Sequence, residues 1–242
     1  MKCLFLAAGY ATRLYPLTQD FPKPLLEVQG KSILDWLLDD LDVCGVDTGR
    51  VVVTNHRFAR HFAEWAARRG NIAIVDDGSM TNETRVGAVR DIALAIDQCG
   101  LDEDLLVLAG DNLLGFSLAP FLEYARRKRT SCVMRYWEPN LARLKKSGVL
   151  TIDDHDRVLS MAEKPPVPAT HWCCPPFYYF VREDVAKVRE GLAAGCGTDS
   201  PGSYIAWLAT AAPIHAMEMP GRRYDIGDME SYAFAQRAFR KE

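Results

Sequence analysis

Short apolar runs recur along the first half of the chain, and each is closed by small or polar residues. Cys3–Leu6 is followed by Ala-Ala-Gly, and Leu105–Leu108 is followed by Ala-Gly-Asp. Runs of this length that are apolar at every position are typical of strands buried on both faces of a sheet. The pattern predicts four such strands, at residues 3–6, 51–54, 72–75 and 105–108.

Between these strands the hydrophobic residues repeat every three or four positions, which is the period of an amphipathic helix. Ser32, a residue type that favours the N-cap, directly precedes the first such segment. The first predicted helix starts at residue 33 and stops near Gly45, the second carries Phe58, Phe62 and Trp65 on one face, and the third runs from about residue 85 to residue 98. Strands that alternate with helices predict an α/β fold, a Rossmann-like, doubly wound and mostly parallel sheet with helices on both faces.

The pattern changes after Ser131, where strand-like runs follow one another with few helices between them. These runs predict a smaller, β-rich lid built from residues 132–136, 148–152, 158–161 and 177–181. The acidic segment 153–156 separates two of the runs and is typical of a hairpin turn whose charges face water. No repeat or low-complexity linker divides the sequence, so we expect a single domain over residues 1–242.

The composition narrows the classes of protein to consider. Of 242 residues, 48% are hydrophobic and 25% are charged, which suffices for the core of a globular α/β protein. With 29 basic and 32 acidic residues the net charge is −3, which argues against a general nucleic-acid-binding surface. Any strong positive potential is therefore expected to be local, as in a pocket for an anionic small molecule.

No apolar run approaches the roughly 20 residues that cross a bilayer, and Met1-Lys2 leads into the first strand without a secretory signal. We therefore expect a cytoplasmic protein with no membrane partner. The seven cysteines form an odd set without a Cys-x-x-Cys pair, which favours reduced and mostly buried thiols over disulfides or a zinc site. The sequence leaves open whether the chain forms a homo-oligomer.

The turn after the first strand combines small residues with two spaced cations. Backbone amides at Ala7, Ala8 and Gly9 can receive base or phosphate oxygens, because small side chains let a ligand come close. Arg13 and Lys23 lie on either side of a turn whose prolines limit the movement of both side chains. Two positive charges placed in this way can oppose the charge of a polyphosphate, which predicts a site for a nucleoside triphosphate.

The spacing of Ala8-Gly9, Thr12-Arg13, Pro16-Leu17-Thr18 and Pro22-Lys23-Pro24 resembles the signature loop of the sugar-phosphate nucleotidyltransferases, or nucleotide-sugar pyrophosphorylases. The chain resembles the glucose-1-phosphate thymidylyltransferase-like members, although its Ala-Ala-Gly form is closer to the uridylyl- and cytidylyltransferase branches. The resemblance implies catalytic roles for Arg13 and Lys23. It implies nucleotide binding by Ala7, Ala8, Gly9, Thr12, Asn82 and Gly110.

By motif order the resemblance extends over nearly the whole chain. It implies a nucleotide-binding half at residues 1–130 and an acceptor-binding half at residues 131–242, in which the β-rich lid lies on the acceptor side. Some relatives carry a C-terminal β-helix, whereas this chain ends in a predicted helix after Asp228. We therefore expect no C-terminal β-helix.

Two aspartates stand at positions suited to a metal ion. Asp111 follows the strand predicted at 105–108, at the edge where ligands lie in open α/β sheets. Asp225 ends a later strand-like segment and resembles the family's second metal-binding aspartate. Mg²⁺ commonly uses one or two carboxylates together with phosphates and water, so these two residues are the predicted magnesium ligands. Asp228, three residues on, is predicted to be only the N-cap of the last helix.

The segment Ala162-Glu163-Lys164-Pro165 resembles the family's acceptor motif. In relatives the glutamate contacts sugar hydroxyls and the lysine contacts the acceptor phosphate, roles that suit a carboxylate and an ammonium. The resemblance thus implies in-line attack of a sugar-1-phosphate on the α-phosphorus of a nucleoside triphosphate, with release of pyrophosphate. Arg13 would face the pyrophosphate, and Lys23 the α-phosphoryl group and the acceptor phosphate.

The acceptor side also departs from the family's pattern. Cys173-Cys174-Pro175-Pro176 stands where many relatives have a glycine beside the sugar. Thr81-Asn82 resembles the choline-phosphate cytidylyltransferase-like members, which accept a small zwitterionic phosphate monoester. An aromatic cage for such a group would come from Tyr136, Trp137, Trp172, Phe177 and Tyr178.

Two further classes compete with these interpretations. A non-catalytic nucleotide sensor of the same fold would usually lack a catalytic cation or a metal-binding aspartate, and this chain has both. A nicotinamide-dependent dehydrogenase needs Gly-x-Gly-x-x-Gly leading into a helix. The segment 7–12 does not supply that motif, and Pro16 prevents a helix from following at once. The base and the acceptor stay open, and the predicted partners are a nucleoside triphosphate and a phosphate monoester.

Overall fold

The computed structural model describes residues 1–46 and 49–241, which form two compact units, each discontinuous in sequence. The N-terminal unit comprises Lys2–Arg85, Ala109–Ala119 and Pro220–Glu242. The central unit comprises Met1, Val86–Leu108 and Pro120–Met219. The chain therefore enters the N-terminal unit three times.

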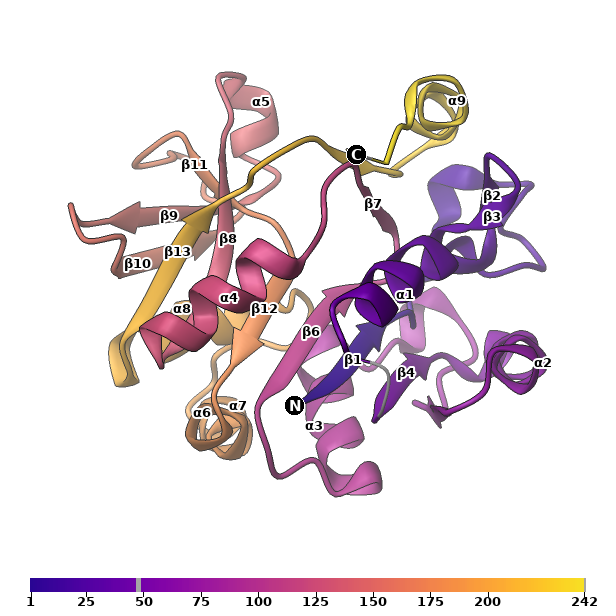
Figure 1. The fold of residues 1–242 in the computed structure, drawn as a ribbon, viewed down its shortest axis with the longest axis horizontal. Coiled ribbons are helices and arrows are strands. Elements are labelled where there is room, and N and C mark those ends of the chain that lie inside the picture. Colours follow the sequence, from indigo (N-terminus) through magenta and orange to yellow (C-terminus); the bar gives the residue numbers. More distant parts are fainter. Residues whose placement is uncertain (47–48, 242) are drawn as a thin grey trace. The chain divides into compact units, whose positions relative to one another are not determined.

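A parallel sheet forms the base of the N-terminal unit. Its strands lie in the order β1 (Lys2–Leu6), β4 (Arg50–Thr54) and β5 (Ile72–Asp76). The helices α1 (Ile33–Val43) and α2 (Ala59–Arg69) connect these strands (Figure 1). β4 is buried along its whole length, whereas β5 is only partly buried. The strands and helices predicted for this region are confirmed, and the ends that were predicted agree with the observed ones within two residues.

The predicted N-cap of α1 is also confirmed. The Ser32 hydroxyl accepts the N–H of Asp35 at 3.0 Å, which satisfies one of the donors that a helix leaves unpaired at its start.

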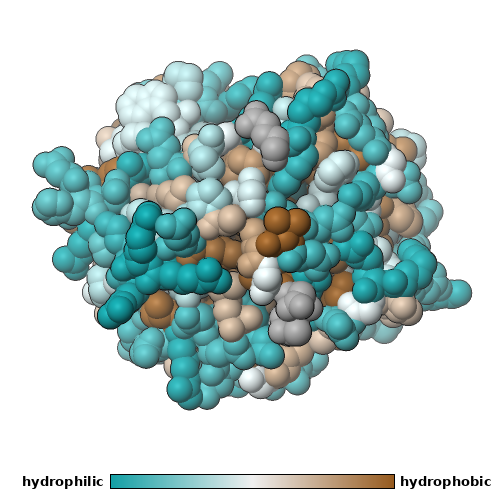
Figure 2. Space-filling view, viewed as in Figure 1, coloured by the Kyte–Doolittle hydropathy of each residue, from teal (hydrophilic) through white to brown (hydrophobic). Residues whose placement is uncertain are grey.

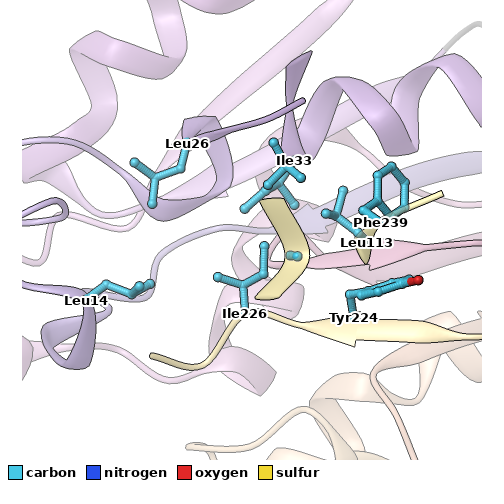
Figure 3. Packing of buried hydrophobic residues seen from close by; sticks show 9 residues of the cluster. Leu14, Leu26, Ile33, Leu113, Tyr224, Ile226 and Phe239 are labelled. Atoms are coloured by element: carbon cyan, nitrogen blue, oxygen red, sulfur yellow. The ribbon is translucent and has the colours of Figure 1, made fainter. Parts of the chain in front are cut away.

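Segments that are far apart in sequence complete the N-terminal unit. β7 (Asn112–Leu114) pairs antiparallel with β14 (Arg223–Asp225), β2 (Glu27–Val28) pairs with β3 (Lys31–Ser32), and α9 (Met229–Ala238) follows. Figure 3 shows the hydrophobic cluster that joins these elements. Its buried members are Leu14, Leu26, Val28, Ile33, Leu113, Tyr224, Ile226, Ala235 and Phe239. Burial of this apolar surface holds the signature loop and the last helix against α1.

The central unit is rich in strands, as expected for the second half of the chain. Its sheet has the order β10-β9-β11-β8-β12-β6, and β13 lies parallel to β8 while the other neighbours in this unit are antiparallel. The bounds are β6 (Leu105–Ala109), β8 (Ser131–Trp137), β9 (Gly148–Ile152), β10 (Val158–Glu163), β11 (Trp172–Cys174), β12 (Phe177–Phe180) and β13 (Ile214–Glu218).

Several helices of the central unit were not predicted. The unit contains α3 (Ala88–Cys99), α4 (Ala119–Lys128), α5 (Leu141–Leu144), α6 (Arg182–Ala186), α7 (Val188–Ala193) and α8 (Gly202–Ala211). Only α3 was expected, and it begins three residues later than predicted because Gly87, with φ of 100°, precedes it. The hairpin turn predicted at 153–156 is confirmed, since Asp156 donates its N–H to the carbonyl of Asp153 at 3.2 Å.

The predicted α/β class is confirmed, and the residues that the structure describes contain no β-helix. Within those residues, no helix combines the length and the apolar character needed to cross a bilayer. The seven cysteines, all of them within the described residues, form no disulfide, and four of them are buried. Hydrophilic residues predominate on the face shown in Figure 2, with hydrophobic residues scattered among them, as is normal for a globular surface.

Candidate functional site

The signature loop begins where β1 ends, and hydrogen bonds fix its first residues. Ala7 donates its N–H to the carbonyl of Val53 at 2.9 Å, so this amide, contrary to the prediction, is already occupied within the protein. Asn55 Nδ2 donates to the carbonyl of Ala8 at 3.0 Å. Gly9 is exposed, and a Cβ added there would meet no atom within 4 Å. The backbone at Gly9 is therefore accessible to a ligand, as the predicted nucleotide-binding role requires.

Arg13 lies in a short 3-10 helix, Thr12–Leu14, that is anchored by its last residue. Leu14 is fully buried in the cluster of Figure 3, while the other two residues of this helix are exposed. Thr18 Oγ1 donates to the carbonyl of Ala11 at 2.8 Å and closes the turn. Burial of Leu14 thus fixes the helix and keeps the Arg13 guanidinium on the surface, where an anion can reach it.

Lys23, the second predicted catalytic cation, is buried. It begins the 3-10 helix Lys23–Leu25 and has 8% of its surface exposed. Its ammonium lies 2.8 Å from Asp111 Oδ2 and also donates to the carbonyl of Ile226. A buried charge needs such partners, because leaving it unpaired is costly. Lys23 therefore ties together three predicted parts of the site: the signature loop, the Asp111 segment and the segment that follows Asp225.

Gly110 allows the Asp111 segment to lie close to β1. Its N–H donates to the carbonyl of Leu6 at 3.0 Å. A Cβ at position 110 would lie 3.3 Å from that oxygen and 3.5 Å from the ring of Pro24. The missing side chain at Gly110 thus permits the approach that brings Asp111 to Lys23.

The electrostatic surroundings keep Asp111 ionised. Burial would raise the pKa of this carboxyl, but the Lys23 ammonium and the charge of Arg223 outweigh it and hold the pKa below its usual value. Asn112 Nδ2 also donates to Asp111 Oδ1 at 2.5 Å. At neutral pH Asp111 is therefore a carboxylate, which is the form that binds a metal ion.

The pairing of β7 with β14 brings Asp225 next to this group. In that antiparallel ladder Asp225 stands directly opposite Asn112, the residue that follows Asp111. The Asp225 side chain is 55% exposed, and its Oδ2 lies 3.6 Å from a guanidinium nitrogen of Arg223. The two predicted metal ligands thus occur at the same end of one ladder, although they are more than 100 residues apart in sequence.

The residues after Asp225 have structural roles. Asp228 is the N-cap of α9, where its carboxylate accepts the N–H of Ser231 at 2.9 Å, so the predicted cap is confirmed. Its bonds with Ser231, and to a smaller extent the charge of Arg13, lower the pKa of the Asp228 carboxyl. A guanidinium nitrogen of Arg13 lies 3.6 Å from the point where a Cβ of Gly227 would stand. Arg13 therefore lies beside the segment that carries Asp225.

The donor set suits magnesium in an open site. The Asp111 and Asp225 side chains are 39% and 55% exposed, so water and substrate oxygens can reach both carboxylates. No group of three or more Asp, Glu, His or Cys residues suited to a metal occurs in the part of the chain that the structure describes. Two carboxylates fit an ion that keeps water and shares phosphate oxygens, and they do not fit a closed protein-only site of the zinc type.

Asn82 lies on a separate loop of the N-terminal unit. It begins the 3-10 helix Asn82–Thr84, and its side-chain oxygen accepts from Arg85 at 3.3 Å. The same loop is linked to the signature loop by a 3.3 Å hydrogen bond between the hydroxyls of Tyr10 and Ser79. Tyr10 is thus a buried connection between the two predicted nucleotide-binding segments.

The predicted acceptor residues lie at the end of β10 in the central unit. Burial raises the pKa of the Glu163 carboxyl, although the adjacent Lys164 opposes the shift. Lys164 has a φ of 47°, donates its N–H to the carbonyl of Ser147 at 3.0 Å and is exposed. Its ammonium is 4.0 Å from Asp199 Oδ2. A lysine held in the left-handed region is uncommon, and here it presents the ammonium to solvent.

The aromatic residues predicted for a choline cage differ in their exposure to solvent. Phe177 and Tyr178 are buried core residues of β12. Trp137 is 55% exposed, stacks on His171 at 4.9 Å between ring centroids, and makes an edge contact with Trp172 at 5.2 Å. Two of the five aromatic side chains are therefore occupied in the core.

Sequence reasoning missed two side chains near the predicted metal ligands. Arg223 donates from a guanidinium nitrogen to Asn112 Oδ1 at 2.6 Å, so both residues support the Asp111 and Asp225 pair. Residues two apart on a strand face the same side, and this rule alone would have placed Arg223 beside Asp225. Asn112 was visible as the residue next to Asp111.

Similarity to known proteins extends over nearly the whole chain. The model of the nucleotidyl transferase family matches residues 2–242. UTP–glucose-1-phosphate uridylyltransferase AglF of Haloferax volcanii is 25% identical over 243 residues, which cover 100% of this chain and 98% of that protein. Glucose-1-phosphate thymidylyltransferase of Mycobacterium tuberculosis (strain CDC 1551) is 28% identical over 196 residues, which cover 79% of this chain and 65% of that relative. This chain thus spans nearly all of the first relative and just under two thirds of the second.

A solved structure agrees in fold. The crystal structure of an apo UDP-glucose pyrophosphorylase matches with a TM-score of 0.82 and 20% identity, over 98% of this chain and 97% of that one. Because the family model matches residues 2–242, this chain belongs to the nucleotidyl transferase family: it is a nucleotidyltransferase, and the resemblance to the sugar-phosphate nucleotidyltransferases is confirmed.

Proposed function

We propose that this chain transfers a nucleoside monophosphate from a nucleoside triphosphate to a sugar-1-phosphate, with magnesium, and so forms a nucleotide sugar and pyrophosphate. The observation that carries the proposal is the contact between Lys23 and Asp111, with Asp225 opposite the residue after Asp111. One buried cation and two accessible carboxylates are the groups that a triphosphate and its magnesium ion require.

The reaction is a direct displacement at phosphorus. An oxygen of the acceptor phosphate attacks the α-phosphorus, the bond from that phosphorus to the bridging oxygen breaks, and pyrophosphate leaves with the bonding electrons. No covalent intermediate with the protein is needed, so the side chains act by positioning and by neutralising charge. When bound by Asp111 and Asp225, magnesium would neutralise phosphate charge.

The two cations would each neutralise a different reacting group. Arg13, exposed on its 3-10 helix, would bind the pyrophosphate as it leaves. Lys23, a compact charge held beside Asp111, would bind the α-phosphoryl group and draw the acceptor phosphate towards it. The nucleotide-binding residues we propose are Ala7, Ala8, Gly9, Thr12, Asn82 and Gly110.

Glu163 and Lys164 are the proposed acceptor residues. The Glu163 carboxyl would accept hydrogen bonds from sugar hydroxyls, and Lys164 would neutralise the acceptor phosphate. We also propose that residues 1–242 act as one catalytic domain, with nucleotide-binding residues in 1–130 and acceptor-binding residues in 131–242. Asp225 is then the exception, a donor-side ligand supplied from the second half.

The test is a pyrophosphate-release screen that crosses the common nucleoside triphosphates with phosphate monoesters. Glucose-1-phosphate with UTP or dTTP comes first, because the relatives are named for these reactions. Turnover that depends on magnesium and on a sugar-1-phosphate supports the proposal. Turnover of phosphocholine but of no sugar phosphate would assign the chain to the cytidylyltransferase-like alternative.

A further inference from the structure

Two glycines of the central unit have no conformational reason to be glycine. Gly148 begins β9 and Gly202 begins α8, and neither has a positive φ. Glycine in a helix also costs stability relative to alanine. The absence of a side chain must therefore serve another purpose, and at both positions that purpose is space.

The space is taken up by the side chains of Glu163 and Met161. A Cβ at position 202 would lie 1.9 Å from Glu163 Oε1 and 2.5 Å from Met161 Cε. A Cβ at position 148 would lie 2.3 Å from the same methyl carbon and 3.3 Å from the same carboxylate oxygen. A Cβ atom essentially never lies within 3.0 Å of such a neighbour, so these side chains would have to move. The two glycines thus leave a slot in which the Glu163 carboxyl lies.

Packing, and not hydrogen bonding, locates this carboxyl. Among the residues that the structure describes, no hydrogen bond or ion pair within the protein holds the Glu163 side chain. The charge of Lys164 lies nearby but belongs to an exposed side chain. The position of the carboxyl therefore depends on the shape of the slot, and Gly202 makes the nearest wall.

We propose that Gly202 is a positioning residue for acceptor binding: by lacking a side chain, it keeps the Glu163 carboxyl where it can receive the hydroxyls of a sugar phosphate. The inference rests on the proposed function, since it assumes that Glu163 contacts the acceptor. Gly202 itself need not touch the substrate, and it acts only through Glu163.

An alanine at position 202 should displace the Glu163 carboxyl without lowering the stability of the fold. The atoms that an alanine at 202 would displace are the ends of two flexible side chains, so the backbone can stay in place while the carboxyl moves. An alanine also raises the helix propensity of the first residue of α8. Gly202→Ala should therefore fold and should move the carboxyl, which is the combination that identifies a positioning residue.

The first experiment measures steady-state kinetics for the parent, G202A and the matched control S203A, the next residue of α8. We expect the KM for the sugar phosphate to rise in G202A on the order of 10- to 100-fold, the effect of losing a hydrogen bond to a charged group. The KM for the nucleoside triphosphate should stay within about 2-fold in both variants. An unchanged acceptor KM in G202A would overturn the inference.

A double-mutant cycle separates a role through Glu163 from a general disturbance. In an E163A background the carboxyl is absent, so adding G202A should change the acceptor KM by less than about 2-fold. A further 10-fold loss in that background would contradict the inference. If the parent turns over no sugar phosphate at all, the proposed function itself fails, which this series distinguishes from failure at Gly202 alone.

A second measurement does not depend on activity. Carbon-13 NMR titration of the glutamate carboxyls, with E163Q used to assign the signal, follows Glu163 in the ligand-free protein. If an alanine at 202 pushes the carboxyl out of the slot towards water, its titration midpoint should fall in G202A towards that of an ordinary glutamate. A midpoint equal to that of the parent would show that the carboxyl has not moved and would overturn the proposal.

Discussion

At the scale of single residues, Lys23 has the most informative environment in the N-terminal unit. Its ammonium is shared between Asp111 and a backbone carbonyl, so the charge that we expect to meet phosphate is already held in place before any ligand binds. Such preorganisation lowers the cost of reorganising the site during the reaction. It also means that changes at Lys23 affect both catalysis and stability.

We predict that Lys23→Met lowers kcat by roughly 100- to 1000-fold, the usual loss when one charge-stabilising donor is removed. Because the Asp111 side chain is 39% exposed and can regain water, the unfolding free energy should fall by only about 1–2 kcal/mol. Stopped assays and urea unfolding measure the two effects. Lys23→Arg is the control: it keeps the charge, so a kcat equal to that of the parent would show that the compact shape of lysine is not required.

Glu163 yields a prediction about pH. Burial raises the pKa of this carboxyl, so between the ordinary carboxyl pKa and the raised value the folded protein binds more protons than the unfolded chain. Stability therefore falls as pH rises through this window, and the penalty persists at higher pH.

Glu163→Gln removes this titration and nearly keeps the shape of the side chain. We expect the variant to have a higher unfolding free energy than the parent at neutral pH, and the difference to vanish below about pH 4, where the parent is also uncharged at this position. Urea unfolding at the two pH values measures it. Glu218→Gln, an exposed change in the same unit, is the control. A parent that is the more stable of the two at neutral pH would refute the argument.

At the scale of elements, two aspartates three residues apart should respond in opposite ways. Asp228 caps α9, so Asp228→Ala should lower the unfolding free energy by about 1 kcal/mol and leave kcat within about 3-fold. Asp225→Asn changes an exposed carboxylate at the end of β14. It should leave stability nearly unchanged but reduce magnesium-dependent turnover by at least about 10-fold, because a ligand is lost. Equal losses of activity in both variants would contradict the assignment of Asp225.

Elements formed by local sequence were predictable, and an element formed by distant pairing was not. β1 and β4 are continuous apolar runs between turn residues, and α1 has a capping serine, so each could be recognised from a short window. β7 has three residues and was not predicted, and it is a strand because it pairs with β14, more than 100 positions later in the sequence. Such pairing is set by tertiary structure and leaves no local pattern.

The candidate site follows the same rule. The residue types of the signature loop and the strand-end position of Asp111 were visible in the sequence. The burial of Lys23, its bond to the Ile226 carbonyl and the slot that Gly202 leaves for Glu163 were not, because each depends on a segment that folding brings from elsewhere. The sequence therefore predicted which residues make up the candidate site, but it did not predict the burial and the contacts that hold their side chains in place.

At the scale of the whole molecule, the open question is whether residues 1–242 behave as one domain. The chain enters the N-terminal unit three times, and all the proposed nucleotide-binding and metal-binding residues lie in that unit. The proposed acceptor residues lie in the central unit. A ligand that binds only the folded protein stabilises whatever unfolds together with its site. Ligand-induced stabilisation therefore reports on how far cooperativity extends.

We predict a single thermal transition that moves as a whole when a nucleoside triphosphate and magnesium are added. At a concentration 100 times Kd the gain is about 2.7 kcal/mol, which for a chain of this size raises Tm by roughly 5–10 °C. Chelation of magnesium, or the change Asp111→Asn, should remove most of that shift. Two transitions of which only one moves would show that the units unfold separately, and residues 1–242 would then have to be treated as two domains, of which only the N-terminal unit is stabilised by nucleotide.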